Sequence, residues 1–484
     1  IPNTVNYCGA GAQTLKAPSA NYYYLKISNA GTKTMNASIT VNGSCTIQNN
    51  ATLEDNGNLL QGPGDLIMTD NSNFNVSRAG IEPRLSGAYN LTGGTINFDR
   101  NGNQTVRNIY PQGYYNVNFT NNGTKTLGGN LLVKNNLFIS GSAVLEISTS
   151  LYSVEVQGNW TVTSTAGDPF RERTSIVSFT GYAPQTISTV LAAGETFYDL
   201  VLNNSLGITL DPSLTNLNIT NNITIENLSV FNANGRPVNV NGNWINNGGT
   251  HNPGNNTTTF RGSLQSISNT GTETFNNLSL INASNVTLGC PVNINGNLSL
   301  ANTSRLDVSV SNFDVFLKGN WNITSTNADP FVENSGTVTF NGTALQTLTT
   351  PLAQETFYNV VFSNNIGGVR LDKPIVTSAD LTISLGGKLN ANNQNISVKG
   401  NWNNNGGTFT PGTNTVTFDG TAMQTITNTS GETFYGLTVN TTGPLTLDQF
   451  SPVTVTNTLN LTQGNINLNT SSLTLGNRDR KSVV

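Results

Sequence analysis

The chain has 484 residues, of which 10% are charged and 36% hydrophobic, and its formal net charge is −4 from 22 basic and 26 acidic side chains. The basic residues form no cluster, which excludes the positively charged surface that nucleic acids or anionic membranes require. No run of 18 apolar residues is present, so the sequence predicts no membrane-spanning helix. Apolar and polar residues alternate in short segments such as Val416–Phe418, which indicates ordered β-structure and not a disordered polar tract.

One phrase occurs six times along the chain. It consists of an aromatic residue, a glycine and a Gln-Thr pair (Gln-Ser in the fourth copy). The glutamines are Gln13, Gln104, Gln185, Gln265, Gln346 and Gln424, at intervals of 91, 81, 80, 81 and 78 residues. A nearly fixed period is typical of stacked repeat proteins, so we predict six repeats of about 80 residues each.

Two further triplets occur four times each. A Glu-Thr-Phe triplet follows the Gln-Thr phrase, and a Gly-Asn-Trp triplet closes the repeat. The glutamates are Glu195, Glu273, Glu355 and Glu432, and the tryptophans are Trp160, Trp244, Trp321 and Trp402. Two kinds of repeat alternate, because the first and third tryptophans precede Asp-Pro-Phe, whereas the second and fourth precede Gly-Gly-Thr and Pro-Gly. The first repeat diverges after about residue 55 and lacks the Trp.

The spacing of apolar residues predicts the fold. Strand cores between Leu445 and Leu475 lie six to eight residues apart, which leaves little room for ordinary hairpins. We therefore predict an all-β parallel β-helix (β-solenoid) in which three short strands form a coil of about 20–22 residues. Gly and Asn suit the turns, and Asn at equivalent turns can form ladders. Tandem β-sandwich modules are the alternative, although their turns recur every 8–12 residues or so and no linker separates the repeats.

The predicted solenoid covers residues 1–477. Residues 478–484 have no repeat character, and Asp479–Val484 matches the translated beginning of a common sequencing adapter. We expect this tail to be non-native, the result of adapter read-through on an assembled environmental fragment. No signal peptide is recognisable after Ile1, so any targeting segment has been removed or was not captured.

The sequence predicts no catalytic residue, no cofactor and no metal site. The single histidine, His251, lies in a Gly/Asn/Pro segment and is interpreted as a variable loop residue. The pairs Asp168/Glu172 and Asp329/Glu333 are the best enzymatic candidates, since two carboxylates can act as acid and base on a glycan. Their duplication and the turn chemistry of Asp-Pro favour a structural role.

Other residues also have two interpretations. The glutamates of Glu-Thr-Phe either bind Ca²⁺ between coils or, as we expect, make capping or turn hydrogen bonds. The tryptophans either stack on sugars or, as we expect, pack inside the solenoid. Thr415–Thr417 and Thr454–Thr456 resemble ice-binding rows but are also ordinary outward strand residues. Cys8 and Cys45 either pair in an oxidising compartment or remain free thiols.

The segment 400–439 contains Gly-Asn-Trp, Gly-Gly-Thr-Phe, Thr-Val-Thr-Phe, Gln-Thr-Ile and Glu-Thr-Phe-Tyr in succession. This repeat style resembles the long repetitive surface proteins and adhesins of Bacteroidota, over essentially all of residues 1–477 and most sharply over 158–475. The resemblance implies export to the cell surface, often by the type IX route with a C-terminal sorting domain. No such domain is recognisable in this sequence, so the export route stays open.

Together these features predict an extracellular, cell-surface stalk that is structural and adhesive, is not an enzyme, and makes multivalent contact with glycans or surfaces. The expected partners are carbohydrates or other cell-surface ligands, without nucleic acid. A β-helical polysaccharide-active enzyme, either a lyase or a glycoside hydrolase, is the alternative function. An ice-binding protein is the third.

Overall fold

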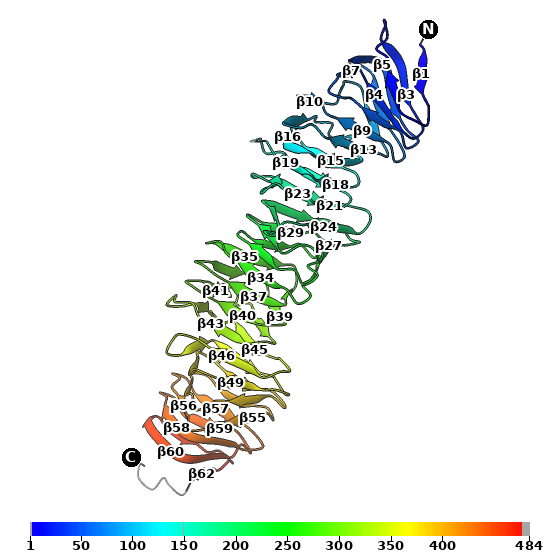
Figure 1. The fold of residues 1–484 in the computed structure, drawn as a ribbon. Helices are drawn as coiled ribbons and strands as arrows, with labels where there is room; N and C mark the ends of the chain where they lie inside the picture. Colours follow the sequence, from blue (N-terminus) through cyan, green and yellow to red (C-terminus); the bar gives the residue numbers. More distant parts are fainter. Residues whose placement is uncertain (1, 149, 477–484) are drawn as a thin grey trace. The chain divides into compact units, whose positions relative to one another are not determined.

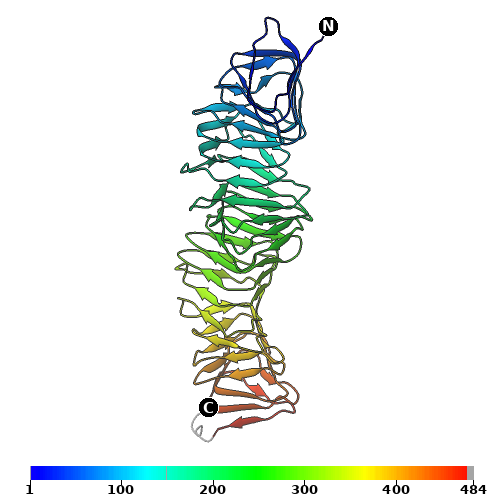
Figure 2. The ribbon, with the colours of Figure 1, turned by 45° about the vertical axis from the view of Figure 1, so that its right-hand side comes forward.

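The computed structural model describes residues 2–148 and 150–476, so the expected non-native tail at 478–484 lies outside the described residues. All regular elements in the described ranges are β-strands, and each pairs in parallel with the strand at the equivalent place in the next coil. The chain divides into two compact units, Ile1–Val238 with Asn247–Asn252 and Asn239–Asn246 with Pro253–Val484. In each unit the short strands lie one upon another (Figures 1 and 2). The predicted parallel β-solenoid is therefore confirmed over the antiparallel sandwich alternative.

The strands of the first unit form several parallel sheets. A 12-stranded sheet contains β2 (Gln13–Leu15), β4 (Thr32–Met35), β6 (Thr52–Glu54), β9 (Asn73–Val76), β13 (Thr95–Phe98), β15 (Asn116–Phe119), β18 (Leu137–Ile139), β21 (Trp160–Val162), β24 (Gln185–Thr189), β27 (Ile208–Leu210), β30 (Val230–Asn232) and β33 (Thr250–Asn252). A 7-stranded sheet contains β1 (Thr4–Tyr7), β3 (Tyr22–Ile27), β5 (Ile39–Ile47), β7 (Leu60–Gly62), β8 (Asp65–Met68), β11 (Arg84–Leu85) and β12 (Tyr89–Leu91). A 5-stranded sheet contains β10 (Ile81–Glu82), β14 (Gln104–Val106), β16 (Asn122–Leu127), β19 (Ser142–Glu146) and β22 (Phe170–Arg171). The remaining strands are β17 (Leu131–Val133), β20 (Val154–Val156), β23 (Ile176–Phe179), β26 (Asp199–Leu202) and β29 (Ile223–Ile225), with β25 (Glu195–Phe197) and β28 (Leu217–Ile219).

The second unit is built in the same way, with three strands to a coil. One face contains β32 (Trp244–Asn246), β35 (Gln265–Asn269), β38 (Asn285–Leu288), β41 (Arg305–Asp307) and β44 (Phe331–Val332), and later β47 (Glu355–Phe357), β50 (Ile375–Thr377), β53 (Ile396–Val398) and β56 (Thr415–Phe418). The long strands β58 (Glu432–Asn440) and β60 (Val453–Gln463) each continue over two faces. Their second parts pair in the column of β56, and their first parts pair in the column that ends with β62 (Leu473–Leu475). The next face contains β36 (Glu273–Phe275), β39 (Val292–Ile294), β42 (Val315–Leu317), β45 (Thr337–Phe340), β48 (Asn359–Phe362), β51 (Leu381–Ile383), β54 (Trp402–Asn404), β57 (Gln424–Thr427), β59 (Leu445–Leu447) and β61 (Ile466–Asn467). The last face contains β34 (Thr257–Phe260), β37 (Asn277–Leu280), β40 (Leu298–Leu300), β43 (Trp321–Ile323), β46 (Gln346–Thr349), β49 (Val369–Leu371), β52 (Lys388–Asn390) and β55 (Thr408–Thr410), and β31 (Val238–Val240) lies at the division of the chain.

The coils differ in length more than the sequence predicts. Thr32 pairs with Thr52, 20 positions further on, which agrees with the predicted 20–22 residues. Trp160 pairs with Ile187, 27 positions further on, and Trp321 pairs with Leu348 at the same interval. The longer coils are those that contain Asp-Pro-Phe. They still have three strands, but β22 and β44 begin ten residues after the tryptophan, whereas β33 and β55 begin six residues after it.

The interior of each unit is filled by the alternation of the short strands. In most strands of three residues, the first and third side chains are buried and the middle one is partly exposed, as in β20 and β53. The pattern is reversed in a few strands, such as β33 and β52, whose middle side chain is the buried one. Leu, Ile, Val and Phe occupy most buried positions. Removing such side chains from water contributes about 1.5–3 kcal/mol each. The predicted inward and outward patterning is therefore confirmed.

The repeat does not contain a whole number of coils. In the second unit the Gln-Thr phrase begins β35, β46 and β57, so successive copies are eleven strands apart. Because a coil has three strands, whole coils would place the copies nine or twelve strands apart. Each repeat therefore shifts the phrase by one face, and its three copies in this unit lie on three different sheets.

The glutamine of the phrase joins one coil to the coil before it. Gln346 Oε1 accepts a hydrogen bond from Gly342 N at 2.9 Å, and its Nε2 donates to Leu317 O at 2.9 Å and Gly319 O at 2.6 Å. Gln185, Gln265 and Gln424 make the same three bonds to their own neighbours. These buried side chains therefore satisfy backbone groups at a corner, where strand pairing ends.

In the first two copies, the phrase glycine is not the donor. Gln13 accepts from Gly9 at 2.8 Å, and Gln104 accepts from Arg100 at a longer 3.4 Å. In both, the donor lies four residues before the glutamine, as it does for Gln185, Gln346 and Gln424. In these copies, the backbone N–H that donates to the glutamine is therefore set by its distance along the chain and not by the presence of glycine.

Asparagines form ladders at another corner. Asn136 N donates to Asn116 Oδ1 at 3.0 Å, Asn159 N to Asn136 Oδ1 at 2.9 Å, and Thr186 N to Asn159 Oδ1 at 2.9 Å. The same ladder in the second unit contains Asn277, Asn297, Asn320 and Thr347. The predicted ladder is thus confirmed, with side-chain oxygens accepting from the backbone of the next coil. The asparagine of Gly-Asn-Trp is one of its steps.

We predict that Gln346→Leu strongly destabilises the second unit locally. The change removes hydrogen bonds to three backbone groups, and each buried group left without a partner costs about 1–3 kcal/mol. Hydrogen exchange followed by mass spectrometry is expected to show faster exchange in peptides around 317–319 and 342. Thr347→Ala is the control, because Thr347 is the partly exposed neighbour. Unchanged exchange in Gln346→Leu would contradict a structural role.

We also predict that Gly342→Ala is poorly tolerated, whereas Gly271→Ala is nearly neutral. A Cβ at Gly342 would lie 2.2 Å from Lys318 O, but a Cβ at Gly271 meets no atom within 4 Å. Relieving such an overlap requires the coils to separate, at a cost of about 1–3 kcal/mol or more. Chemical denaturation of the two variants measures the difference, and equal stabilities would show that the corner adapts freely.

Candidate functional site

The four tryptophans lie inside the solenoid and are fully buried. Trp160 packs edge-on against Phe170 and Phe197, with ring centroids 4.8 and 5.3 Å away. Trp402 repeats this arrangement with Phe409 and Phe434 at 4.8 and 5.3 Å. Aromatic pairs of this kind add about 0.5–1.5 kcal/mol beyond simple burial. The predicted packing role is confirmed, and these rings cannot serve as exposed platforms for sugars.

The two kinds of repeat supply the same ring by different means. In the Asp-Pro-Phe repeats, Phe170 and Phe331 each lie 4.8 Å from the tryptophan of their coil. In the last Gly-Gly-Thr repeat, Phe409 takes this place at the same distance. Thus two different segments, Asp-Pro-Phe and Gly-Gly-Thr-Phe, place a phenylalanine at the same position beside the tryptophan.

His251 follows the same pattern, and its interpretation as a variable loop residue was wrong. It lies in the middle of strand β33, is 8% exposed, and stacks on Phe231 with ring centroids 5.5 Å apart. It occupies the position that Phe409 has in the later repeat, so an aromatic ring is required there. The surrounding glycines and asparagines belong to turns. Because the strand between these turns has only three residues, its pattern could not be recognised in the sequence.

The glutamates of Glu-Thr-Phe are interior residues, so the predicted capping or turn role was wrong. Each begins a strand with its side chain directed inward, and none is more than 4% exposed. The side chains lie beside the tryptophans, as shown by Trp402 Nε1, which donates to Glu432 Oε2 at 2.8 Å. A carboxyl group in this setting must find hydrogen-bond donors or remain protonated.

Two different environments surround these glutamates. In the Gly-Gly-Thr repeats two asparagine amides donate to the carboxylate. Asn246 and Asn269 reach Glu273 Oε2 at 2.8 Å each, and Asn404 and Asn428 reach Glu432 Oε2 at 2.8 and 3.3 Å. In the Asp-Pro-Phe repeats the first asparagine is replaced by Val162 or Ile323. There, Oε2 of Glu195 and of Glu355 is buried without a hydrogen-bond partner, as are the neighbouring Trp160 and Trp321 nitrogens.

The electrostatics follow this difference. Burial raises the pKa of Glu195 to about 8, against the opposing effect of the Trp160 and Thr189 side chains. Burial likewise raises the pKa of Glu355 to about 7, opposed mainly by Thr350. The pKa of Glu432 is also raised by burial, with the Asn404 amide as the main opposing influence. Glu195 is therefore largely protonated at neutral pH, as a buried carboxylic acid with few donors should be.

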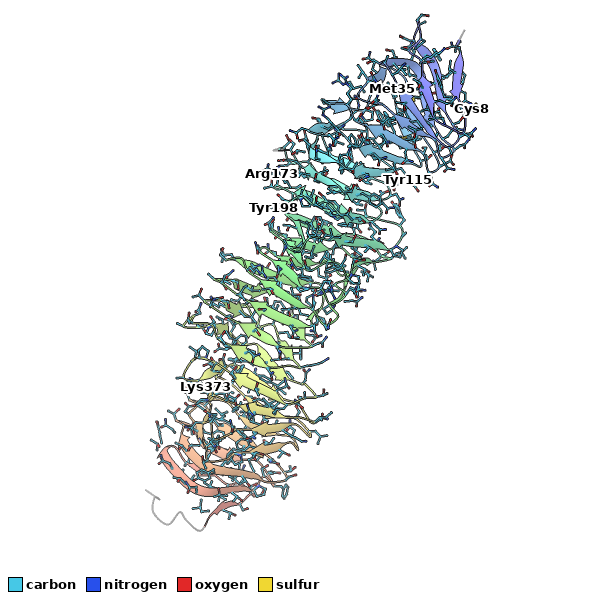
Figure 3. The ribbon with its side chains drawn as sticks, in the orientation of Figure 1. Cys8, Met35, Tyr115, Arg173, Tyr198 and Lys373 are labelled. Carbon is cyan, nitrogen blue, oxygen red and sulfur yellow. The ribbon has the colours of Figure 1, made fainter. Side chains whose placement is uncertain are left out.

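The acid pair of the first unit lies on its surface. Asp168 and Glu172 line one shallow pocket of about 370 Å³, together with Arg171 and Arg173. Both arginines pair with Glu146, at 2.9 Å for Arg171, and Arg171 lies 3.6 Å from Asp168. Arg173 projects at the edge of this unit (Figure 3). Charge compensation of this kind is typical of a surface ion-pair network.

Asp168 also borders a second pocket of about 190 Å³ that Glu195 lines as well. The structure thus brings together three acids, of which the sequence analysis paired only two. Asp168 is 64% exposed, whereas Glu195 is 2% exposed. An exposed carboxylate beside a protonated, buried carboxyl is an acid and base combination in principle. The burial of Glu195 restricts access by any large substrate.

The second unit repeats the pair with different neighbours. The pKa of Glu333 is raised by burial and by the nearby Asp329. Asp329 lies 3.9 Å from Arg305, a residue of the preceding coil that the sequence analysis did not single out. The counterpart of Arg305 in the first unit is Val144. Leu306 pairs with Phe331 as Leu145 pairs with Phe170, and Arg305 and Val144 each precede the leucine. The two acid pairs are therefore not equivalent.

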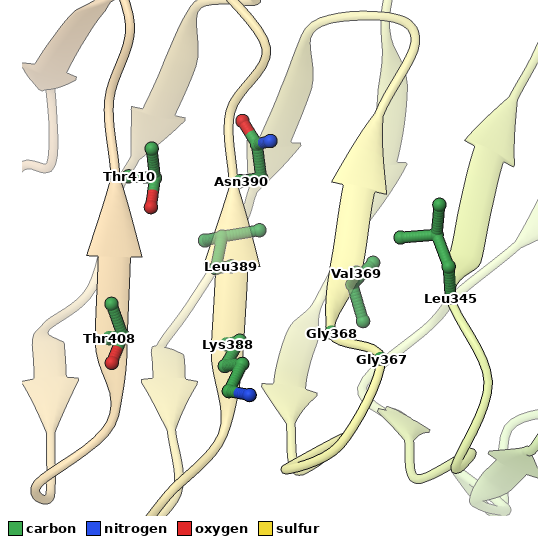
Figure 4. A pocket seen from close by; sticks show the side chains of 9 residues that line it. All are labelled: Leu345, Gly367, Gly368, Val369, Lys388, Leu389, Asn390, Thr408 and Thr410. Carbon is green, nitrogen blue, oxygen red and sulfur yellow. The ribbon is translucent and has the colours of Figure 1, made fainter.

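A shallow groove crosses β49, β52 and β55 of the second unit (Figure 4). Its volume is about 220 Å³, its floor contains Val369 and Leu389, and Lys388 and Thr408 lie at its rim. The Gly367-Gly368 turn leaves space beside Leu345. The groove contains no carboxylate, so it offers no acid or base chemistry.

The cysteines form no disulfide among the described residues. Cys8 is exposed, and Cys45 and Cys290 are buried free thiols. Burial raises the pKa of Cys45 to about 12, which makes it unreactive at neutral pH. No group of three or more His, Cys, Asp or Glu residues within 2–148 and 150–476 is arranged to hold a metal ion.

Comparisons with known protein families, with curated proteins and with solved structures find no match to this chain. In the part of the chain that the structure describes, no helix has the length and apolar character needed to cross a bilayer. The functional argument therefore depends on the geometry of the fold and of these clusters.

We predict that the first unit becomes less stable as the pH rises from 5 to 9, and that Glu195→Gln reduces this dependence. The folded-state pKa of Glu195, about 8, lies above its ordinary 4.5, so the fold favours the protonated carboxyl. This stabilisation is complete below pH 4.5 and is lost as the pH rises through 8, by at most about 1.4 kcal/mol per pH unit. Denaturation at several pH values, followed by tryptophan fluorescence, measures the effect. Glu226→Gln, at a partly exposed position, is expected to keep the wild-type dependence.

Proposed function

We propose that this chain is an extracellular, non-catalytic protein of the cell surface whose repeats provide structural support and multivalent adhesion to glycans. One observation carries the proposal: the residues that recur from repeat to repeat are those that hold coil to coil or fill the interior. The glutamine and asparagine bond neighbouring coils, and the tryptophan and glutamate fill the interior. Repetition has therefore preserved stacking and not a reactive cluster.

The outward side chains support an adhesive role more than a catalytic one. Middle positions of the short strands carry Thr, Asn and Ser, as in β29 (Thr224), β40 (Ser299) and β51 (Thr382), and only 10% of the residues are charged. Hydroxyl and amide groups exchange hydrogen bonds with sugar hydroxyls at low desolvation cost. Weak contacts of this kind gain strength when many act together on one chain.

The ice-binding alternative requires long, regular rows of threonines, and the register provides only short ones. Thr454 aligns with Thr433 in the coil before it and with Thr474 in the coil after it, which is a row over three coils. Thr415 aligns with Gly436 and then with Thr458, and Thr417 aligns with Thr438 and then with Asn460. The column that starts at Thr415 is interrupted by Gly436, and the column that starts at Thr417 is interrupted by Asn460. The eleven-strand repeat also moves equivalent residues from face to face, which opposes a flat lattice match.

One specific observation favours the enzymatic alternative. Asp168 is exposed beside the protonated Glu195, and both line the pocket of about 190 Å³. The depth of Glu195 argues against proton donation to a polysaccharide, since a general acid must reach within about 3.2 Å of the atom it protonates. Adhesion therefore remains the proposal that the geometry supports best.

The proposal predicts that the purified chain is retained on insoluble plant or algal polysaccharides but releases no soluble sugar. Antibodies against the chain are expected to label intact cells of the organism that encodes it, without permeabilisation. The heat-unfolded chain serves as the control for retention. Sugar release that Asp168→Ala and Asp329→Ala together abolish would replace the proposal with the enzymatic one, and thermal hysteresis would replace it with ice binding.

A further inference from the structure

A polar pocket lies on the second unit, beside its Asp-Pro-Phe segment. It has a volume of about 340 Å³ and is lined by Ala283, Ser284, Asn285, Thr303, Arg305, Asn327 and Asp329. Its residues come from three successive coils, since Asn285 pairs with Arg305 and Leu306 pairs with Phe331, two residues after Asp329. Small-molecule sites begin at about 300 Å³, so the pocket suits one compact ligand.

Two polar atoms of this pocket are buried without a hydrogen-bond partner. They are Ser284 Oγ, in a residue that is 0% exposed, and Asn285 Oδ1. Native proteins pair nearly all buried polar groups, and an unpaired one costs about 1–3 kcal/mol. Ser284 and Asn285 both line the pocket, so these unpaired atoms lie next to the space that a ligand would occupy.

The charged residues of the pocket remain available for hydrogen bonding. Arg305 lies 3.8 Å from Asp307 and 3.9 Å from Asp329, beyond the usual 2.7–3.2 Å or so of an N–H···O hydrogen bond. Asp329 is 61% exposed, and Arg305 is 32% exposed. The guanidinium thus has donors, and the carboxylate has acceptors, that face solvent at the same site.

The charge pattern selects the class of ligand. Two carboxylates, Asp307 and Asp329, oppose binding of an acidic ligand, and the guanidinium between them opposes a bare cation. A neutral ligand with adjacent hydroxyl groups can donate to Asp329 and accept from Arg305 at once. Further hydroxyls can bond to Ser284 and to the Asn285 amide.

We propose that this pocket binds one neutral pyranose unit of a glycan. The inference rests on the proposed adhesive function for its ligand class, but two of the residues that carry it, Asn285 and Arg305, have no like residue at the equivalent place in the first unit. At the equivalent position of the first unit Val144 replaces Arg305, and Thr124 replaces Asn285. The paired repeats therefore provide a natural control for the pocket.

The test is titration of the full chain by saturation-transfer NMR and calorimetry. The probes are the methyl glycosides of glucose, mannose, galactose and N-acetylglucosamine, with glucuronic acid and CaCl₂ alone for comparison. At least one neutral glycoside is expected to bind. Arg305→Val, which copies the first unit, and Asp329→Ala are each expected to weaken it about tenfold or more. Asp168→Ala, the matched change in the first unit, is expected to leave binding unchanged.

Several outcomes would contradict the proposed sugar binding at this pocket. These are binding that Arg305→Val and Asp329→Ala both leave unchanged, binding of glucuronic acid or calcium alone in place of neutral sugars, or no glycoside binding at all. Circular dichroism of each variant shows that loss of binding is not loss of fold. Retention of both wild type and Arg305→Val on insoluble glycans would reject this pocket but keep the proposed function. Absence of wild-type retention and of surface labelling would reject the proposed function itself.

Discussion

The structure depends on hydrogen bonds between side-chain amides and the backbone of the neighbouring coil. Strands of three or four residues leave a large share of the backbone in turns, where no parallel ladder can satisfy it. Gln346 supplies one acceptor and two donors at such a corner, and Asn297 and Asn320 supply acceptors at another. These bonds allow a coil with few residues per face to stack closely, and they explain why Asn and Gln recur at fixed places.

The interior adds a second constraint, because it contains one carboxyl group beside each tryptophan. The Gly-Gly-Thr repeats surround this group with two asparagine amides, whereas the Asp-Pro-Phe repeats keep an apolar residue there, and burial raises the pKa of Glu195 to about 8 and of Glu355 to about 7. Each solution avoids an unpaired buried charge. The alternation of two repeat types is therefore visible in the chemistry of the interior as well as in the length of the coils.

Much of the fold could be predicted from the sequence, because parallel stacking follows from strand spacing and turn composition. The length of the coils at Trp160 and Trp321 could not, since Asp-Pro-Phe was interpreted as a turn and in fact leads, after a longer connection, into β22 or β44, a regular strand of its coil. Glu195 and His251 were assigned to turns because polar residues beside Gly and Asn favour such positions, yet both face the interior.

The sequence does contain a signal for the two glutamate environments. Trp-Ile-Asn and Trp-Asn-Asn mark the repeats in which Asn246 and Asn404 reach the carboxylate, whereas Trp-Thr-Val and Trp-Asn-Ile mark the others. The polar pocket at Arg305 could not be predicted in this way. It depends on the register that places Asn285 beside Arg305, 20 positions apart, and no local pattern specifies that register.

The eleven-strand period described for the second unit has an evolutionary consequence. If recombination deleted or duplicated one repeat, every strand after the junction would still find an equivalent neighbour, so the interior would stay intact. All later outward side chains, however, would turn by one face around the axis of the stack. Only gain or loss of three repeats at once would restore their original direction. Copy number in such genes would therefore control the azimuth of binding groups as well as their number.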